Sequence, residues 1–288
     1  MNVKTVGVVG CGLMGSGIVE VLAKNGYNVI VREVNDDFLQ KGLARVHAST
    51  QKAVDRNKLT ADARKEALTR IVGTTKLEDL NICDYVIEAA VENLNLKKDI
   101  FERLDAITRP EVILASNTSS LSIAEMAAKT HKPDKVLGMH FFNPVPVMPL
   151  LEIVRSFMTS EDTYQTSRAL GESLGKKVIV AKDLPGFIVN ALLVPYQLDA
   201  IRFYENGLAS KEDIDTGVRL GLNHPMGPLE LCDFVGVDTV LYIADEMYAE
   251  TKDPRYAAPP LLRRMVAAGY HGRKTGKGFY DYSNQAKS

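Results

Sequence analysis

The residues best suited to proton transfer are a histidine and a glutamate on neighbouring apolar runs. His140 lies near the end of the run 136–142, and Glu152 lies in the next run, 150–154. If the connection folds back, the carboxylate can fix the imidazole tautomer and favour its protonated form. Histidine has a reference pKa of about 6.5, so such a pair can exchange a proton with a hydroxyl group when an alcohol and a ketone interconvert. Spacing alone leaves open the alternative that His140 is a buried structural histidine.

The N-terminal residues carry the pattern of a dinucleotide site. The apolar run 6–9 leads into a G-x-G-x-x-G sequence made by Gly10, Gly12 and Gly15, and a helical pattern follows. Gly10 can make the tight turn, Gly12 lets the backbone approach a pyrophosphate, and Gly15 lets the helix pack closely on the strand. The helix N-terminus presents N–H groups and its positive dipole end to the phosphates. The alternative is a glycine-rich surface turn.

A second apolar run, residues 29–31, ends at Arg32 and Glu33. An acid at the tip of the second strand of a dinucleotide fold binds the ribose hydroxyls of NAD. Glu33 would also repel the 2′-phosphate of NADP, whereas an arginine at that strand end can accept it. Glu33 therefore predicts NAD as the cofactor, and Arg32 leaves NADP as the alternative.

Length and composition indicate a globular enzyme of two domains. The chain has 288 residues, 45% of them hydrophobic and 25% charged, which is ordinary in composition but long for one domain. Its formal net charge of -1 offers no basic surface for nucleic acid or an anionic membrane. No apolar run approaches the roughly 20 residues that span a bilayer. Three widely spaced cysteines and an immediate first strand predict a cytoplasmic protein with neither disulfides nor a signal peptide.

The order of the expected elements indicates an α/β fold class. Strands and helices alternate as far as about residue 183, which predicts a Rossmann-type, doubly wound, mostly parallel sheet. Beyond the first two strands, we expect strands at 71–72, 85–87, 112–115, 136–142, 150–154 and 177–180, and helices near 36–56, 60–69 and 96–107. From residue 187 the patterns are helical, at 187–206, 211–220, 238–249 and 260–268. We therefore predict an NAD-binding domain, residues 1–184, and an all-helical substrate and dimerisation domain, residues 185–288.

Several motifs resemble those of the 3-hydroxyacyl-CoA dehydrogenase family. Besides the glycine motif they are Ser116-Asn117-Thr118-Ser119-Ser120-Leu121, His140-Phe141-Phe142-Asn143-Pro144, Pro185-Gly186-Phe187-Ile188-Val189-Asn190 and Pro225-Met226-Gly227-Pro228. They follow one another from about residue 5 to Tyr282, so the resemblance covers almost the whole chain. The short second domain is similar to that of the single-function bacterial 3-hydroxybutyryl-CoA dehydrogenases. The resemblance implies NAD-dependent interconversion of (S)-3-hydroxyacyl-CoA and 3-oxoacyl-CoA, with the four-carbon pair as the expected substrates.

The resemblance also implies roles for individual residues. It makes His140 the catalytic acid/base, Glu152 its orienting partner, and Ser119 and Asn190 the groups that bind the reacting oxygen. A hydroxyl and an amide can donate hydrogen bonds to a carbonyl oxygen that gains negative charge. The implied cofactor contacts are Gly10, Gly12, Leu13, Met14, Gly15, Glu33, Glu92, Lys97, Ser119 and Asn143. The implied substrate contacts are Ser49, Lys52 and Arg56 for coenzyme A, and Ser119, His140 and Asn190 for the acyl group.

Some of these assignments have alternatives. Lys97 could belong to a surface ion pair, Ser119 to a turn, and the segment that carries Ser49, Lys52 and Arg56 could be a solvated helix face. Pro149 and Ala191 replace a lysine and an arginine that are common in the family, and we expect them to alter acyl-CoA affinity or chain-length preference. Two rival functions are a dehydrogenase of a free hydroxy acid, as in gulonate-type relatives, and a non-catalytic NAD-binding protein.

A homodimer through the second domain is expected. The family resemblance implies it, and the apolar residues around that domain's turns are more than a small domain readily buries. These residues are Leu222, Met226, Leu229, Leu231 and Val235. The basic segment 272–278 lacks the spacing of a phosphate-binding P-loop and follows no strand, so we interpret it as a solvated turn.

Overall fold

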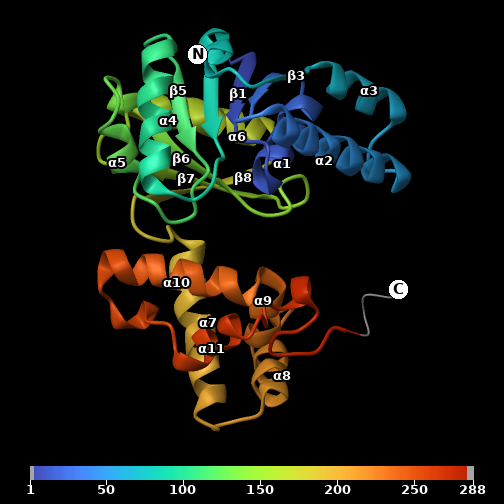
Figure 1. Cartoon of the computed structure of the whole chain (residues 1–288), viewed down its shortest axis with the longest axis vertical. Helices are drawn as coiled ribbons and strands as arrows, with labels where there is room; N and C mark the ends of the chain where they lie inside the picture. The colour runs from blue at the N-terminus through green and yellow to red at the C-terminus, as the bar shows by residue number, and fades with distance from the viewer. Residues whose placement is uncertain (1–2, 284–288) are drawn as a thin grey trace. The chain divides into compact units, whose positions relative to one another are not determined.

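The computed structural model describes residues 3–283, which fold as two compact units that divide between Leu184 and Pro185 (Figure 1). We call them the sheet unit and the helical unit. The sheet unit is built on one eight-stranded sheet. Its strands are β1 (Thr5–Val9), β2 (Asn28–Arg32), β3 (Ile71–Thr74), β4 (Tyr85–Glu88), β5 (Ile113–Ser116), β6 (Val136–Phe141), β7 (Leu150–Arg155) and β8 (Lys177–Lys182).

The strand order is β3-β2-β1-β4-β5-β6-β7-β8. Neighbouring strands are parallel except for β6 and β7, which are antiparallel. The central strands are continuous apolar runs because helices cover both of their faces. Val6, Val8 and Val31, for example, are completely buried. The predicted doubly wound, mostly parallel sheet is confirmed.

The helices of the sheet unit are α1 (Leu13–Lys24), α2 (Asp36–Asp55), α3 (Ala61–Thr69), α4 (Leu94–Ile107), α5 (Ile123–Ala127) and α6 (Glu161–Ser173). Polar residues start several of them by accepting a backbone N–H, as Asn35 does from Phe38 at 2.9 Å. Helix α6 was not predicted from the sequence. Its buried face includes Ser167 and Gly171 beside Leu170, so the apolar periodicity that would mark the helix is weak.

The helical unit consists of α7 (Val189–Glu205), α8 (Lys211–Gly221), α9 (Pro228–Val235), α10 (Val237–Thr251) and α11 (Pro260–Ala267). Helix α9 was not predicted. Pro228 occupies the first position of this helix, where a missing N–H costs nothing. Asp215 of α8 then accepts the backbone N–H groups of Leu229 and Glu230, at 2.8 and 2.9 Å. Leu229 is consequently buried in the core, and the expectation that it adds to an apolar surface is wrong.

Within residues 3–283, no helix is both long and apolar enough to cross a membrane.

Candidate active site

The strand topology gathers the candidate residues of the sheet unit at one edge. Strands β1, β2, β4, β5 and β6 are parallel, so their C-terminal ends lie together, and the antiparallel β7 begins at that same edge. The strand order reverses between β1 and β4. Ligands of open α/β sheets bind in the crevice outside the carboxyl ends of the strands, at this point of reversal.

His140 and Glu152 are brought together by the β6–β7 pairing. They stand directly opposite each other in the antiparallel register, which places their side chains on one face. His140 Nδ1 lies 2.7 Å from Glu152 Oε2. The glutamate side chain is completely buried and the histidine side chain is 8% exposed. A buried carboxylate at this distance favours a proton on Nδ1 and can stabilise an imidazolium ion.

Two residues that the sequence analysis did not single out hold the backbone around this pair. Lys176 Nζ donates to the carbonyl oxygens of Val145 and Met148, at 2.6 and 2.8 Å, in the connection from β6 to β7. Burial of the Lys176 ammonium lowers its pKa. Asn117 Oδ1 accepts the N–H of Phe141 at 2.9 Å and ties the end of β5 to β6. Asn117 entered the sequence analysis only as part of the motif 116–121, and Lys176 carries no sequence signal, because its partners are backbone groups far along the chain.

The glycine loop between β1 and α1 leaves room for a ligand. Gly10 has φ +95°, and a Cβ there would lie 2.6 Å from the carbonyl oxygen of Ala89. A Cβ on Gly15 would collide with the carbonyl oxygen of Gly10. A Cβ on Gly12 would meet nothing within 4 Å, so that side of the loop is open at the N-terminus of α1. These contacts fit the pyrophosphate of a dinucleotide.

Glu33 lies beside this loop. Its Oε1 accepts the N–H of Cys11 at 2.6 Å, and its Oε2 accepts the N–H of Val34 at 3.0 Å. The neighbouring Arg32 has a buried Nε with no hydrogen-bond partner among the described residues. Burial, and secondarily Glu33, raises the pKa of the Cys11 thiol to about 12. Cys11 is therefore a small buried thiol rather than a reactive thiolate.

Lys97, Glu92 and Ser119 meet at the ends of β4 and β5. Lys97 Nζ lies 2.7 Å from Glu88 Oε1 and 3.2 Å from Glu92 Oε2. Glu92 Oε1 in turn accepts the backbone N–H of Ser119 at 2.9 Å. The Lys97 side chain is only 1% exposed, so its interpretation as part of a surface ion pair is wrong. Glu88 was not singled out from the sequence, where the expected strand 85–87 ends one residue before it.

The remaining candidates lie on α2, after β6 and in the helical unit. Ser49 and Lys52 share one face of α2, and Arg56 continues that face at the end of the helix. Figure 1 shows α2 and α3 side by side next to the β3 edge of the sheet. Asn143 is exposed in the connection after β6. Asn190 lies in the first turn of α7, in the helical unit.

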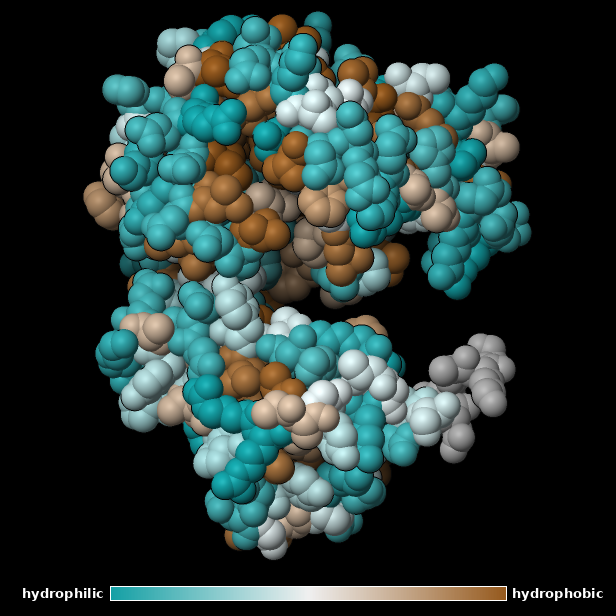
Figure 2. Space-filling view, in the orientation of Figure 1, coloured by the Kyte–Doolittle hydropathy of each residue, from teal (hydrophilic) through white to brown (hydrophobic). Residues whose placement is uncertain are grey.

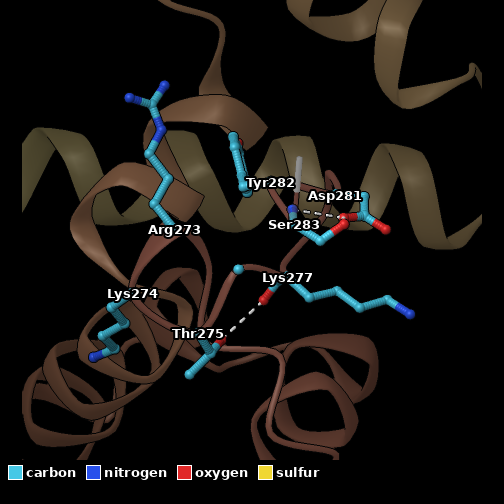
Figure 3. A pocket seen from close by; sticks show the side chains of 8 residues that line it. Arg273, Lys274, Thr275, Lys277, Asp281, Tyr282 and Ser283 are labelled. Atoms are coloured by element: carbon cyan, nitrogen blue, oxygen red, sulfur yellow. Dashed lines mark hydrogen bonds between the residues drawn. The ribbon is translucent and has the colours of Figure 1, made fainter. Parts of the chain in front are cut away.

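A cavity of about 700 Å³ lies at the basic turn of the helical unit (Figure 3). Its lining residues are Arg273, Lys274, Thr275, Gly276, Lys277, Asp281, Tyr282 and Ser283. Arg273 donates to Glu230 at 2.8 Å, Lys274 donates to Asp238 at 2.6 Å, and Lys277 lies over the ring of Tyr270. These pairings fit the predicted solvated turn, and none of the candidate site residues lines the cavity.

Comparison with known proteins decides the family. Residues 5–184 match the model of the 3-hydroxyacyl-CoA dehydrogenase NAD-binding domain, and residues 186–282 match the model of the C-terminal domain of the same enzymes. The chain belongs to the 3-hydroxyacyl-CoA dehydrogenase family. This dehydrogenase is accordingly an oxidoreductase, and its cofactor is NAD.

Three relatives match this dehydrogenase over more than nine-tenths of their own length. A 3-hydroxybutyryl-CoA dehydrogenase of Mycobacterium tuberculosis is 50% identical over 282 residues, which cover 97% of this chain and 99% of that protein. The human mitochondrial hydroxyacyl-coenzyme A dehydrogenase is 44% identical, covering 97% and 91%. The solved structure of an (S)-3-hydroxybutyryl-CoA dehydrogenase from Ralstonia eutropha superposes with a TM-score of 0.93 at 48% identity, covering 98% and 99%.

Proposed function

We propose that this dehydrogenase interconverts (S)-3-hydroxybutyryl-CoA and acetoacetyl-CoA with NAD(H), and that His140 is the acid/base. The observation that carries the proton-transfer role is the hydrogen bond between His140 and the fully buried Glu152. The four-carbon substrate is supported by the names of relatives that are up to 50% identical to this chain.

The His140–Glu152 geometry suggests how the proton moves. With the Nδ1–H donating a hydrogen bond to Glu152, Nε2 is the ring nitrogen that exchanges a proton with the substrate. In the oxidative direction Nε2 takes the hydroxyl proton, and the Glu152 carboxylate stabilises the imidazolium that forms. NAD, when bound, supplies the acceptor for the hydride that leaves the same carbon. In the reductive direction the imidazolium returns its proton to the oxygen.

We propose that the side chains of Ser119 and Asn190 bind the reacting oxygen of the substrate. The Ser119 hydroxyl and the Asn190 amide can both donate hydrogen bonds, and these strengthen as the oxygen gains negative charge. Ser119 follows β5 at the edge of the sheet where β6 places His140. Asn190 is given this role because of its place in the family motif 185–190.

The cofactor contacts follow from the glycine loop and its neighbours. Gly10, Gly12 and Gly15, with Leu13 and Met14, would hold the pyrophosphate at the start of α1, and Glu33 would hold the adenosine ribose. We place Glu92, Lys97 and Asn143 near the nicotinamide end. Along α2, Ser49, Lys52 and Arg56 supply a hydroxyl and two positive charges for the phosphates of coenzyme A.

We further propose a homodimer through the helical unit. Several large apolar side chains of this unit are exposed, among them Leu192 at 73%, Leu220 at 75% and Leu222 at 62%. Figure 2 shows apolar side chains on a mainly hydrophilic visible surface. Burial of such side chains in a subunit interface is favourable. The three free, buried cysteines suit a reducing compartment, and we place the enzyme in the cytoplasm.

The substrate class is tested by initial rates of NADH oxidation with acetoacetyl-CoA and, in parallel, with free acetoacetate. We expect turnover with the thioester only, and we expect free coenzyme A to compete with it. Equal turnover of the free acid would overturn the proposal in favour of a dehydrogenase of free hydroxy acids. Binding of NADH without turnover of any acyl-CoA would favour the non-catalytic interpretation.

A further inference from the structure

We infer that Glu88 is a positioning residue for the reaction, acting through Lys97 and Glu92 on Ser119. Glu88 is the last residue of β4, and it is completely buried. The inference rests on the proposed function, in which the Ser119 hydroxyl donates to the reacting oxygen. The inference adds Glu88 to the proposed site as a residue that does not itself contact that oxygen.

Every oxygen of the Glu88 carboxylate has a partner. Oε1 accepts from Lys97 Nζ at 2.7 Å and from the N–H of Ala90 at 2.6 Å. Oε2 accepts from the hydroxyl of Ser116 at 2.6 Å. A buried carboxylate is stable only while such partners are in place, because an unpaired charge in the interior is strongly destabilising. The Glu88 side chain is therefore fixed at the junction of β4 and β5.

Lys97 is shared between two carboxylates of unequal burial. It lies 2.7 Å from Glu88, which is completely buried, and 3.2 Å from Glu92, whose side chain is 24% exposed. The shorter of these two contacts joins Lys97 to Glu88, the carboxylate whose side chain is fixed. Glu88 thus determines where the Lys97 ammonium sits, and the ammonium determines where Glu92 Oε2 sits.

The second oxygen of Glu92 holds the segment that carries Ser119. Oε1 accepts from Thr118 Oγ1 at 2.5 Å and from the Ser119 N–H at 2.9 Å. The bond from the Ser119 hydroxyl is longer, at 3.3 Å. The backbone of Ser119 is therefore held firmly, whereas its hydroxyl is held weakly and can turn to a substrate oxygen.

Replacement of Glu88 by glutamine would change the net charge of the group formed by Glu88, Lys97 and Glu92. Lys97 now neutralises part of two negative charges, so the three groups together carry a formal charge of -1. In Glu88→Gln, Lys97 would have one carboxylate partner left and would draw Glu92 toward itself. Glu92 Oε1 would then move away from Thr118 and Ser119, and the Ser119 hydroxyl would no longer be aimed at the reacting oxygen.

The test is a double-mutant cycle between Glu88→Gln and Ser119→Ala, measured as kcat for acetoacetyl-CoA and NADH. We expect Glu88→Gln to lower kcat about tenfold in the parent enzyme, and less than about twofold further in the Ser119→Ala background. The matched control is Asp105→Asn. Asp105 is a largely buried acid on α4, paired with His131, and its replacement should leave kcat unchanged. Urea unfolding of each variant separates losses of stability from losses of rate.

Each outcome of the double-mutant cycle either supports the inference about Glu88 or overturns it. Equal losses from Glu88→Gln in both backgrounds, or normal turnover of that variant, would overturn the inference and leave the proposed function intact. Normal turnover of Ser119→Ala alone would overturn the proposed role of Ser119, and the inference would fall with it. If Glu88→Gln does not fold, Ser116→Ala replaces it in the cycle, because it removes one hydrogen bond to Glu88, together with the 3.2 Å bond that the Ser116 hydroxyl accepts from the Thr118 N–H. We expect it to lower kcat by about threefold, and only when Ser119 is present.

Discussion

His140 and Glu152 are cross-strand neighbours, with Nδ1 of the imidazole 2.7 Å from Oε2 of the carboxylate. The antiparallel return of β7 onto β6 creates this contact in a sheet whose other neighbouring strands are parallel. Because Glu152 is completely buried, little water screens the contact between its carboxyl group and the imidazole.

The first prediction concerns that charge. Glu152→Gln keeps the shape of the side chain and removes the negative charge that would stabilise the imidazolium. We expect kcat for acetoacetyl-CoA reduction to fall roughly 10²-fold and the pH–rate profile to change. Steady-state rates across pH check this. An unchanged profile would count against the proton-transfer role of the pair.

The second prediction concerns the cofactor. Glu33→Ala removes the acid at the end of β2 and leaves Arg32 beside the glycine loop. We expect KM for NADH to rise about tenfold and the rate with NADPH to improve, because the repulsion of the 2′-phosphate is lost. Initial rates with both cofactors test this. If the ratio of the two rates does not move, Glu33 does not determine the preference for NAD.

The third prediction concerns Cys83, a buried residue outside the proposed site. Burial, and secondarily Asp84, raises the pKa of its thiol to about 12. Above the ordinary thiol pKa of about 8.5, the unfolded chain loses this proton while the folded protein keeps it. The thiol therefore contributes stability below about pH 8.5 and loses that contribution as pH rises toward 12.

Cys83→Ala tests this through urea unfolding at pH 8 and pH 10. We expect the free energy of unfolding to decrease less between these values in the variant than in the parent. The comparison between the two proteins removes the contributions of other groups that titrate in the same range. A decrease of equal size in both would show that the Cys83 thiol is not responsible.

The fourth prediction concerns the connection between β6 and β7. Lys176→Met keeps a long side chain but leaves the carbonyl oxygens of Val145 and Met148 without their donor. We expect a loss of about 2 kcal/mol in the free energy of unfolding, together with a lower kcat. Lys177→Met, at the exposed neighbouring position, is the control and should change neither. Equal effects of the two substitutions would contradict a specific role for Lys176.

The sheet was predictable because its strands are apolar runs separated by helical patterns. Helices α6 and α9 were not, since a buried Ser167 and a helix-starting Pro228 hide the usual signals. The His140–Glu152 pair could be suggested from two adjacent strands, because cross-strand neighbours lie close in sequence when the connection is short. Glu88 could not be found this way, since its importance comes from contacts with Lys97 and Ser116 on other elements.

The most direct test of the central claim is His140→Asn. Asparagine can keep a hydrogen bond to Glu152 but cannot exchange a proton with the substrate. The measurement is kcat for acetoacetyl-CoA with NADH, together with the dissociation constant for NADH. The proposed mechanism predicts a kcat at least about 10²-fold lower, with NADH binding retained. Near-normal turnover in the folded variant would contradict the role of His140 as acid/base.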